Sequence, residues 1–175
     1  MQHSRFKIVT ACVAFLWLSA SVASAEDQAC TGFSWPLDKE IGWMSAPESE
    51  SVQTGGKISA LPAKAVTLTL KPSKAEDLAV VSGVKKQAVG TDSFSGWFTI
   101  ENVDKGGLYQ ISLSREGWID VSQNGKLVDS TGFTGRRECT VLRKSVRYEL
   151  APGATLIQVV GAPADTIKVT IKQAD

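Results

Sequence analysis

The sequence is poor in histidine. Its only histidine, His3, lies at the start of a region with the pattern of an export signal. Without that region no imidazole is left for Ser-His-Asp or Cys-His catalysis, for histidine-ligated zinc, or for the iron site of many non-haem oxygenases. Clustered acidic calcium loops and the glycine patterns of phosphate-binding and dinucleotide-binding loops are absent as well. We therefore predict no metal ion and no cofactor, and the shortage of histidine argues against histidine-dependent enzymes, non-haem iron dioxygenases included.

Long apolar runs are also scarce. A short basic stretch ending at Lys7 precedes an apolar run from Ile8 to Leu18 and a small-residue stretch that ends in Ala23-Ser24-Ala25. This order predicts a cleaved signal peptide over residues 1–25. The apolar run is shorter than the roughly 20 residues that span a bilayer. We expect a mature chain without a transmembrane segment, acting in the periplasm or outside the cell.

The mature chain has no strong charge of either sign. Removing 25 of the 175 residues leaves 150, a length typical of one domain. It carries 17 basic and 18 acidic side chains once Arg5 and Lys7 are gone. A chain with no overall basic field gives no reason to expect a nucleic-acid partner.

Cysteine is limited to three residues, and Cys12 lies inside the predicted signal. In an oxidising compartment the two that remain, Cys30 and Cys139, are expected to form a disulfide that ties the N-terminus to the second half of the domain. The alternative is a pair of free thiols.

The first part of the mature chain differs from the rest. Leu37, Ile41 and Met44 have the i, i+4, i+7 spacing of a short helix with one apolar face. Residues 45–63 are polar and rich in Gly, Pro and Ser, which predicts a loop or linker. We therefore divide the mature chain into a disulfide-tethered segment and linker over 26–63 and a β-domain over 64–175.

Beyond Pro62, apolar and polar residues alternate in runs broken by turn residues, as in half-buried strands. The expected strands are 66–70, 94–100, 108–114, 118–122, 126–130, 145–150, 155–160 and 166–172. Asn124-Gly125 predicts a hairpin between the fourth and fifth of them. The expected fold is all-β: a single antiparallel β-sandwich of about eight strands with a short N-terminal helical or irregular segment. Its predicted core comprises Val66, Leu68, Leu70, Tyr109, Ile111, Leu113, Ile119, Val121, Val146, Tyr148, Leu150, Ile157, Val159, Ile167, Val169 and Ile171.

Residues 107–113 (GLYQISL), 117–121 (GWIDV), the Pro-Gly turn at 152–153 and residues 166–171 (TIKVTI) follow one another in an order that resembles the bacterial prepeptidase C-terminal type of β-sandwich. This resemblance covers residues 94–172 and implies the fold. Cys30, Phe33 and the segment 35–40 (WPLDKE), taken with Cys139, resemble small exported bacterial proteins, some described as homogentisate dioxygenases. This chain lacks the histidines that such an iron enzyme requires.

Two tryptophans stand out of phase with their apolar neighbours. Trp97 opposes the parity of Phe94, Phe98 and Ile100, and Trp118 opposes Ile119. Both are expected on an outer face of a sheet, where an aromatic ring can stack on a sugar. The alternative is that the tethered N-terminal segment covers them.

Basic side chains gather around Cys139. They are Arg136, Arg137, Arg143, Lys144 and Arg147. Such a cluster can hold a carboxylate, a phosphate or an acidic polysaccharide. The alternative is a solvated loop in which Glu138 and Glu149 act as local partners.

These features favour an exported, non-catalytic binding or accessory module for a glycan, an envelope component or a partner protein. One alternative is a polysaccharide hydrolase that uses carboxylates, with Asp38 and Glu40 or Asp120 and Asp129 as arithmetically available pairs. Another is a structural envelope protein that completes its fold on a partner, which a long unpaired apolar edge strand would favour.

Overall fold

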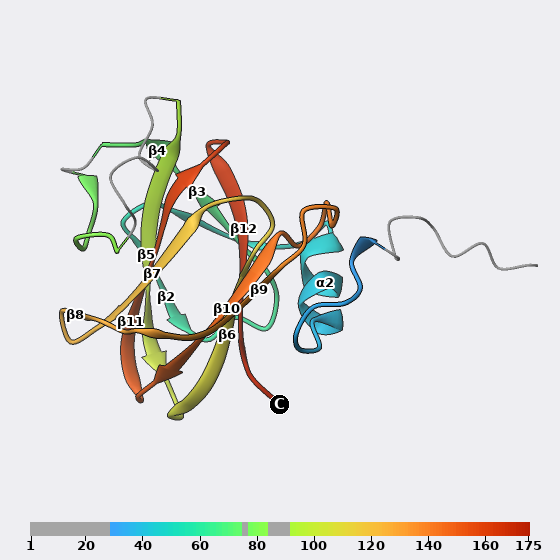
Figure 1. Cartoon of the computed structure of the whole chain (residues 1–175). Coiled ribbons are helices and arrows are strands. Elements are labelled where there is room, and N and C mark those ends of the chain that lie inside the picture. Colours follow the sequence, from blue (N-terminus) through green and yellow to red (C-terminus); the bar gives the residue numbers. More distant parts are fainter. Residues whose placement is uncertain (1–28, 75–76, 84–91) are drawn as a thin grey trace, which may run out of the picture.

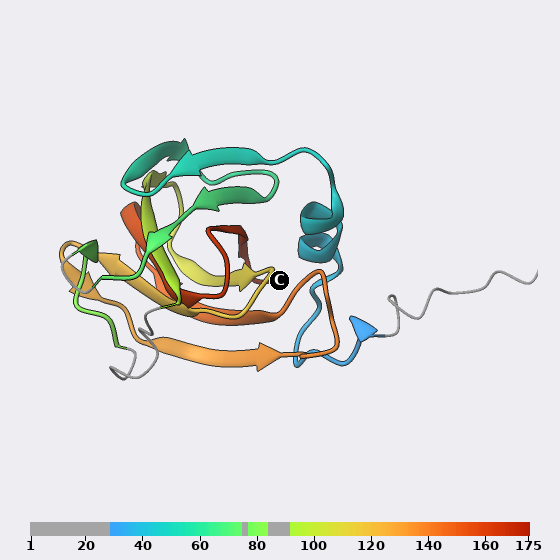
Figure 2. The same cartoon turned by 90° about the horizontal axis from the view of Figure 1, so that it is seen from above.

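Two β-sheets pack face to face in the computed structural model, which describes residues 29–74, 77–83 and 92–175. The predicted signal peptide, with His3 and Cys12, lies outside these residues. No helix among the described residues has the length and apolar character needed to cross a membrane. The mostly antiparallel, two-layer arrangement agrees with the fold predicted from the strand pattern (Figures 1 and 2).

The two sheets interleave along the chain. Sheet A has the order β1 (Glu50–Gln53), β3 (Val66–Thr69), β12 (Thr166–Gln173), β6 (Gly107–Leu113), β10 (Lys144–Leu150), β9 (Ser130–Gly135). Sheet B has the order β2 (Gly56–Ala60), β5 (Phe94–Val103), β11 (Gly153–Ala162), β7 (Trp118–Gln123), β8 (Lys126–Leu127), with β4 (Lys71–Pro72) paired to β5. Consecutive strands therefore form the edges: β1 and β2 on one side, β8 and β9 on the other.

The core lies between the sheets and is made by the alternating apolar residues. Every residue of the predicted core is buried, and Leu68, Ile111 and Ile157 are fully so. The prediction succeeds because period-2 alternation places every second side chain on the inner face of a strand.

The predicted Asn-Gly hairpin is present between β7 and β8. Asn124 and Gly125 have φ values of 52° and 73°, as a type I′ turn requires. The second strand is shorter than predicted, because β8 covers only Lys126–Leu127 before the chain leaves sheet B and enters β9 of sheet A at Ser130. Because of this crossing, the two edge strands on this side of the sandwich, β8 and β9, are consecutive in the chain but belong to different sheets.

The prediction of a loop over residues 45–63 is wrong for two short segments. Glu50–Gln53 pairs with β3 and Gly56–Ala60 pairs with β5, both in parallel register. Each strand buries a single apolar side chain, Val52 or Ile58, so neither produces an alternating pattern strong enough to be recognised in the sequence. The segment closes one edge of the sandwich.

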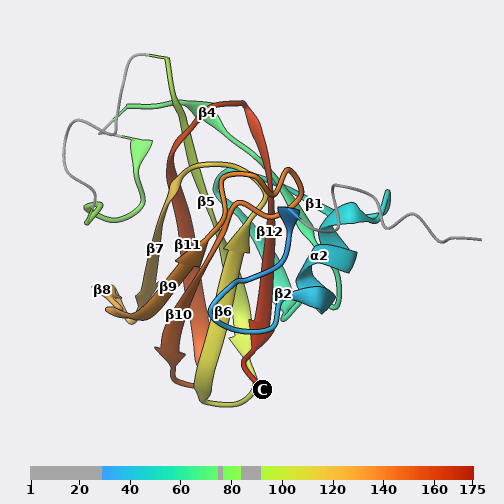
Figure 3. The same cartoon turned by 45° about the vertical axis from the view of Figure 1, so that its right-hand side comes forward.

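The N-terminal segment covers the outer face of sheet A. The predicted helix is α2 (Asp38–Ser45), which buries Met44 and lies outside the sheets (Figures 2 and 3). Cys30 and Cys139 are joined by the expected disulfide, across 109 positions of sequence. At the end of α2, the Lys168 ammonium donates hydrogen bonds to the carbonyls of Met44 and Ala46 at 2.7 and 2.9 Å. A cation at this position is favourable because the C-terminal carbonyls of a helix carry partial negative charge.

Candidate functional site

The edge opposite β1 and β2 is open between the two sheets. Here a cavity of about 400 Å³, which we call the edge cleft, is bounded by β7 of sheet B and by β9 and β10 of sheet A. Its lining residues are Glu116, Trp118, Ile119, Ser130, Phe133, Lys144, Val146 and Tyr148. A volume of this size lies in the range of small-ligand sites.

Strand register explains which side chains meet in the edge cleft. Phe133 of β9 lies directly opposite Val146 of β10, and Lys144 lies two residues along on the same face. Ile119 enters from the inner face of β7. The edge cleft is therefore mainly apolar because it continues the sandwich core out to the surface.

Lys144 places a cation in this apolar wall. Its ammonium lies 5.8 Å from the ring centre of Trp118 and 5.9 Å from that of Phe133, although the residue is only 8% exposed. Burial lowers the pKa of the Lys144 ammonium below its ordinary value, Glu116 opposes this change, and Arg143 adds to it. The nearby Glu116 carboxylate contacts the Arg143 guanidinium at 2.7 Å. No ion pair of Lys144 occurs within the described ranges.

The floor of the edge cleft is fixed by Tyr148. Its hydroxyl donates a hydrogen bond to the carbonyl of Ile119 at 2.9 Å, which links β10 of one sheet to β7 of the other. Burial raises the pKa of the Tyr148 hydroxyl, and the charge of Asp120 adds to this effect. Tyr148 therefore keeps its proton and serves as a fixed hydrogen-bond donor between the two sheets.

Trp118 is held by the outer face of sheet B. Its indole nitrogen donates to Asp120 at 2.8 Å, and the same carboxylate also accepts from the amide of Gly83 at 3.0 Å and from Gln158 at 3.1 Å. The Gln158 side chain in turn bonds the backbone of Val80. The ring is thus oriented by hydrogen bonds and still 43% exposed.

Exposed large apolar side chains concentrate around the edge cleft. Phe133 is 63% exposed and Leu127 is 46% exposed, and Leu127 lines a smaller hollow that shares Trp118 with the edge cleft. Val81 lies in the segment that contacts Asp120 and Gln158. With Trp118 these residues make up all the exposed large hydrophobic side chains of residues 29–74, 77–83 and 92–175. Apolar exposure concentrated on one part of a surface is typical of a binding site.

The second predicted tryptophan lies elsewhere. Trp97 is half-buried on β5, and the turn between β1 and β2 packs on it, since Gly55 lies close to its ring and donates its amide to the Trp97 carbonyl at 2.7 Å. The structure therefore separates Trp97 from Trp118. Trp118 contacts Asp120 and Lys144, whereas Trp35 of the N-terminal segment contacts Ser145 and Arg147 of the opposite sheet.

The basic residues predicted as one cluster point in different directions. Arg136 donates to the carbonyl of Gly32 at 2.6 Å, and Arg147 lies 4.2 Å from the ring centre of Trp35, so both hold the N-terminal segment. Arg137 is exposed, Arg143 contacts Glu116, and only Lys144 enters the edge cleft. Sequence alternation separates Lys144 from Arg147, because residues of opposite parity in a strand face opposite sides.

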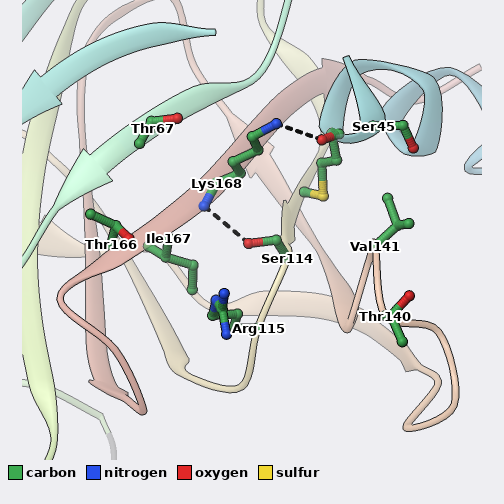
Figure 4. A pocket seen from close by; sticks show the side chains of 10 residues that line it. Ser45, Thr67, Ser114, Arg115, Thr140, Val141, Thr166, Ile167 and Lys168 are labelled. Atoms are coloured by element: carbon green, nitrogen blue, oxygen red, sulfur yellow. Dashed lines mark hydrogen bonds between the residues drawn. The ribbon is translucent and has the colours of Figure 1, made fainter. Parts of the chain in front are cut away.

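A second hollow, of about 450 Å³, lies between α2 and the end of sheet A (Figure 4). Lys168 crosses it, with its ammonium directed to the helix and its amide bonded to the Ser114 hydroxyl at 3.0 Å. Arg115 lies at its exposed rim. Since its half-buried cation already holds α2 in place, this hollow has a structural role and is the weaker candidate site.

The carboxylates considered for a hydrolase are not arranged as a free pair. Glu40 is 1% exposed on the face of α2 that meets sheet A and accepts a hydrogen bond from Gln110 of β6, whereas Asp38 of the same pair is exposed. Asp120 is 5% exposed and engaged by three donors, whereas Asp129 is exposed at the smaller hollow. These positions favour structural roles for Glu40 and Asp120.

Sequence comparison gives no relative for the chain: no protein-family model matches it, and no curated protein matches it. The resemblances described above rest on the strand pattern and the N-terminal motif alone. Residue types and geometry at the edge cleft are therefore the basis for a functional proposal.

Proposed function

We propose that this protein is an exported, non-catalytic glycan-binding module, and that a sugar ring enters the edge cleft and stacks on Trp118 and Phe133. The observation that carries the proposal is the exposure of these two rings, from strands of different sheets, in the lining of one cavity, with a hydrogen bond to Asp120 holding Trp118 in place. Aromatic faces bind sugar rings because they bury a large flat apolar area at small entropic cost.

Three further observations support export and binding. The N-terminus has the order of a signal peptide, and the disulfide is typical of an oxidising compartment such as the periplasm or the cell exterior. The edge cleft also contains polar groups that can select among sugars, namely the Ser130 hydroxyl and the Lys144 ammonium. A few polar groups in an apolar wall are the usual composition of a specific small-ligand site.

A glycan array probed with the purified, oxidised protein tests this proposal, with Trp118→Ala as the test variant and Trp97→Ala as its matched control. We expect bound glycans to be lost with Trp118→Ala and kept with Trp97→Ala, because only the first ring lines the edge cleft. Equal binding by the wild type and Trp118→Ala would place the ligand elsewhere and overturn the proposal. Absence of any bound glycan, for a folded protein, would also overturn it.

The free edge of sheet A favours a second candidate function, the addition of a strand from a partner protein. β9 has the sequence STGFTG, without charge or proline, and within the described ranges it has one neighbouring strand, β10. Uncharged edge strands are templates for pairing with another chain, since their outer amides and carbonyls are open. A Thr131→Pro variant that loses a cross-linked envelope partner, but keeps the fold, would support this candidate.

A further inference from the structure

We infer that the edge cleft selects a sugar that carries a carboxylate, and that the Lys144 ammonium binds this carboxylate. This inference rests on the proposed glycan-binding function and names the ligand class of the same site. Its basis is the position of the ammonium: in the lining of a mainly apolar cavity, 5.8 and 5.9 Å from the centres of two aromatic rings that would stack on the sugar.

The charges around the edge cleft favour an anion. The Glu116 carboxylate is paired with Arg143 at 2.7 Å, and its side chain is 60% exposed at the rim, so this pair contributes little net charge. Asp120 points to the outer face, where Gly83, Trp118 and Gln158 donate to it. The cavity wall is thus left with the positive charge of Lys144.

The surroundings of Lys144 make this charge effective. An ion pair in a partly desolvated, apolar site is stronger than the same pair in water, because the local dielectric response is weaker. An incoming carboxylate also offsets the desolvation that Lys144 already experiences when the cavity is free. Such compensation gives discrimination between a charged ligand and its neutral counterpart.

The aromatic rings restrict the shape of the ligand. The ring centres of Trp118 and Phe133 lie 5.8 and 5.9 Å from the ammonium, which is near the limit of a cation–π contact. A carboxylate attached directly to a pyranose ring can reach the ammonium while the apolar C–H face of that ring stacks on an aromatic face. A uronic acid has this geometry, whereas a flexible or fully polar anion lacks the apolar face.

The test is isothermal titration with a panel of uronic-acid oligosaccharides, each paired with its carboxyl-reduced neutral form, on the wild type and on Lys144→Met. The methionine keeps the length and apolar character of the side chain and removes its charge. Lys126→Met, on the neighbouring β8 outside the edge cleft, is the matched charge control. We expect the wild type and Lys126→Met to prefer the acidic form by at least about tenfold, and Lys144→Met to bind both forms alike.

The outcomes separate this inference from the proposed function. Equal affinity of the wild type for both members of every pair would overturn the carboxylate inference and leave glycan binding in place. A preference that persists in Lys144→Met would overturn the role of Lys144. No binding of either form, with none on the glycan array, would overturn the proposed function itself. Circular dichroism of each variant confirms that the fold is retained.

Discussion

Two regions of this protein use the same residue types in opposite ways. On the outer face of sheet A, Trp35 of the disulfide-tethered segment stacks on Arg147 of β10, and its indole also donates to the Ser145 hydroxyl. At the far edge of the sandwich, Trp118 and Lys144 also form an aromatic–cation contact, but on the wall of an open cavity. The same kind of aromatic–cation pair is thus packed under the chain in one region and exposed at a cavity in the other, and our proposal assigns a binding role only to the exposed pair.

The packing of the N-terminal segment on the outer face of sheet A depends on a network of buried polar groups. Gln110 links Glu40 of α2 to the guanidinium of Arg147, and Ser112 bonds Ser145 beneath Trp35. Such groups stabilise the fold only while each keeps a partner, since an unsatisfied buried polar group costs about 1–3 kcal/mol. At the edge cleft the buried polar groups Asp120 and Gln158 lie behind Trp118, on the outer face of sheet B, and orient a ring that stays partly exposed.

The largest loss of stability should come from removing the disulfide that ties the N-terminal segment to the rest of the chain. We expect the Cys30→Ser, Cys139→Ser double variant to lose about 2–5 kcal/mol of unfolding free energy, because the bridge closes a loop of more than a hundred residues. Urea unfolding measures this loss. Glycan binding at the edge cleft should persist below the new unfolding midpoint; its disappearance from the folded variant would show that the two regions are coupled.

A smaller loss is expected when only the stacked ring is removed. Trp35→Ala should lower the unfolding free energy by about 2–3 kcal/mol, through lost packing on sheet A and the lost contact with Arg147. Ligand affinity should stay unchanged. A variant that bound glycan less well at full stability would contradict the structural role of Trp35.

Removing the Trp118 ring at the edge cleft should have the opposite effect: a large loss of ligand binding and a small loss of stability. Trp118→Ala is expected to weaken glycan binding by at least tenfold, equivalent to about 1.4 kcal/mol, and to cost less than about 1 kcal/mol of stability because the ring is partly exposed. Calorimetric titration and urea unfolding give the two numbers. A large loss of stability with intact binding would assign the ring to the core.

The smallest effect on stability is expected for Lys144→Met, and its sign should be positive. The folded protein holds the Lys144 proton less firmly than the unfolded chain does, since burial lowers its pKa below 10.5. The buried ammonium therefore costs stability at neutral pH, and the cost disappears as pH rises from the folded pKa toward 10.5. The variant should gain at most about 1 kcal/mol at pH 7 and nothing above pH 10.5; destabilisation at pH 7 would contradict this account.

Much of this fold was predictable because its central strands alternate strongly, and the Asn-Gly turn requires its own hairpin. Three of the four edge strands were not: β1, β2 and β9 each have only one large apolar residue, Val52, Ile58 or Phe133, and pairing with a neighbouring strand defines them. An edge strand needs little core contact, so its sequence has little alternation.

The candidate site was predictable only in part. Trp118 and Lys144 were each predicted as candidate site residues from the sequence. Their placement in one cavity was not predicted, because it depends on the crossing from β8 to β9, which brings strands of different sheets to the same edge. Phe133 and Tyr148 gave no separate signal because an apolar residue in a strand is normally part of the core. One available signal was parity, since Lys144 shares a face with Val146 and Tyr148 and thus points inward.

The most direct test of the edge cleft is NMR of the ¹⁵N-labelled, oxidised protein titrated with the tightest-binding glycan from the array. Our account predicts that the indole N–H signal of Trp118 and the amide signals of Phe133 and Lys144 shift in a saturable way, while the indole signal of Trp35 stays in place. Saturable shifts at Trp35 or in the hollow beside α2, with Trp118 unchanged, would contradict it.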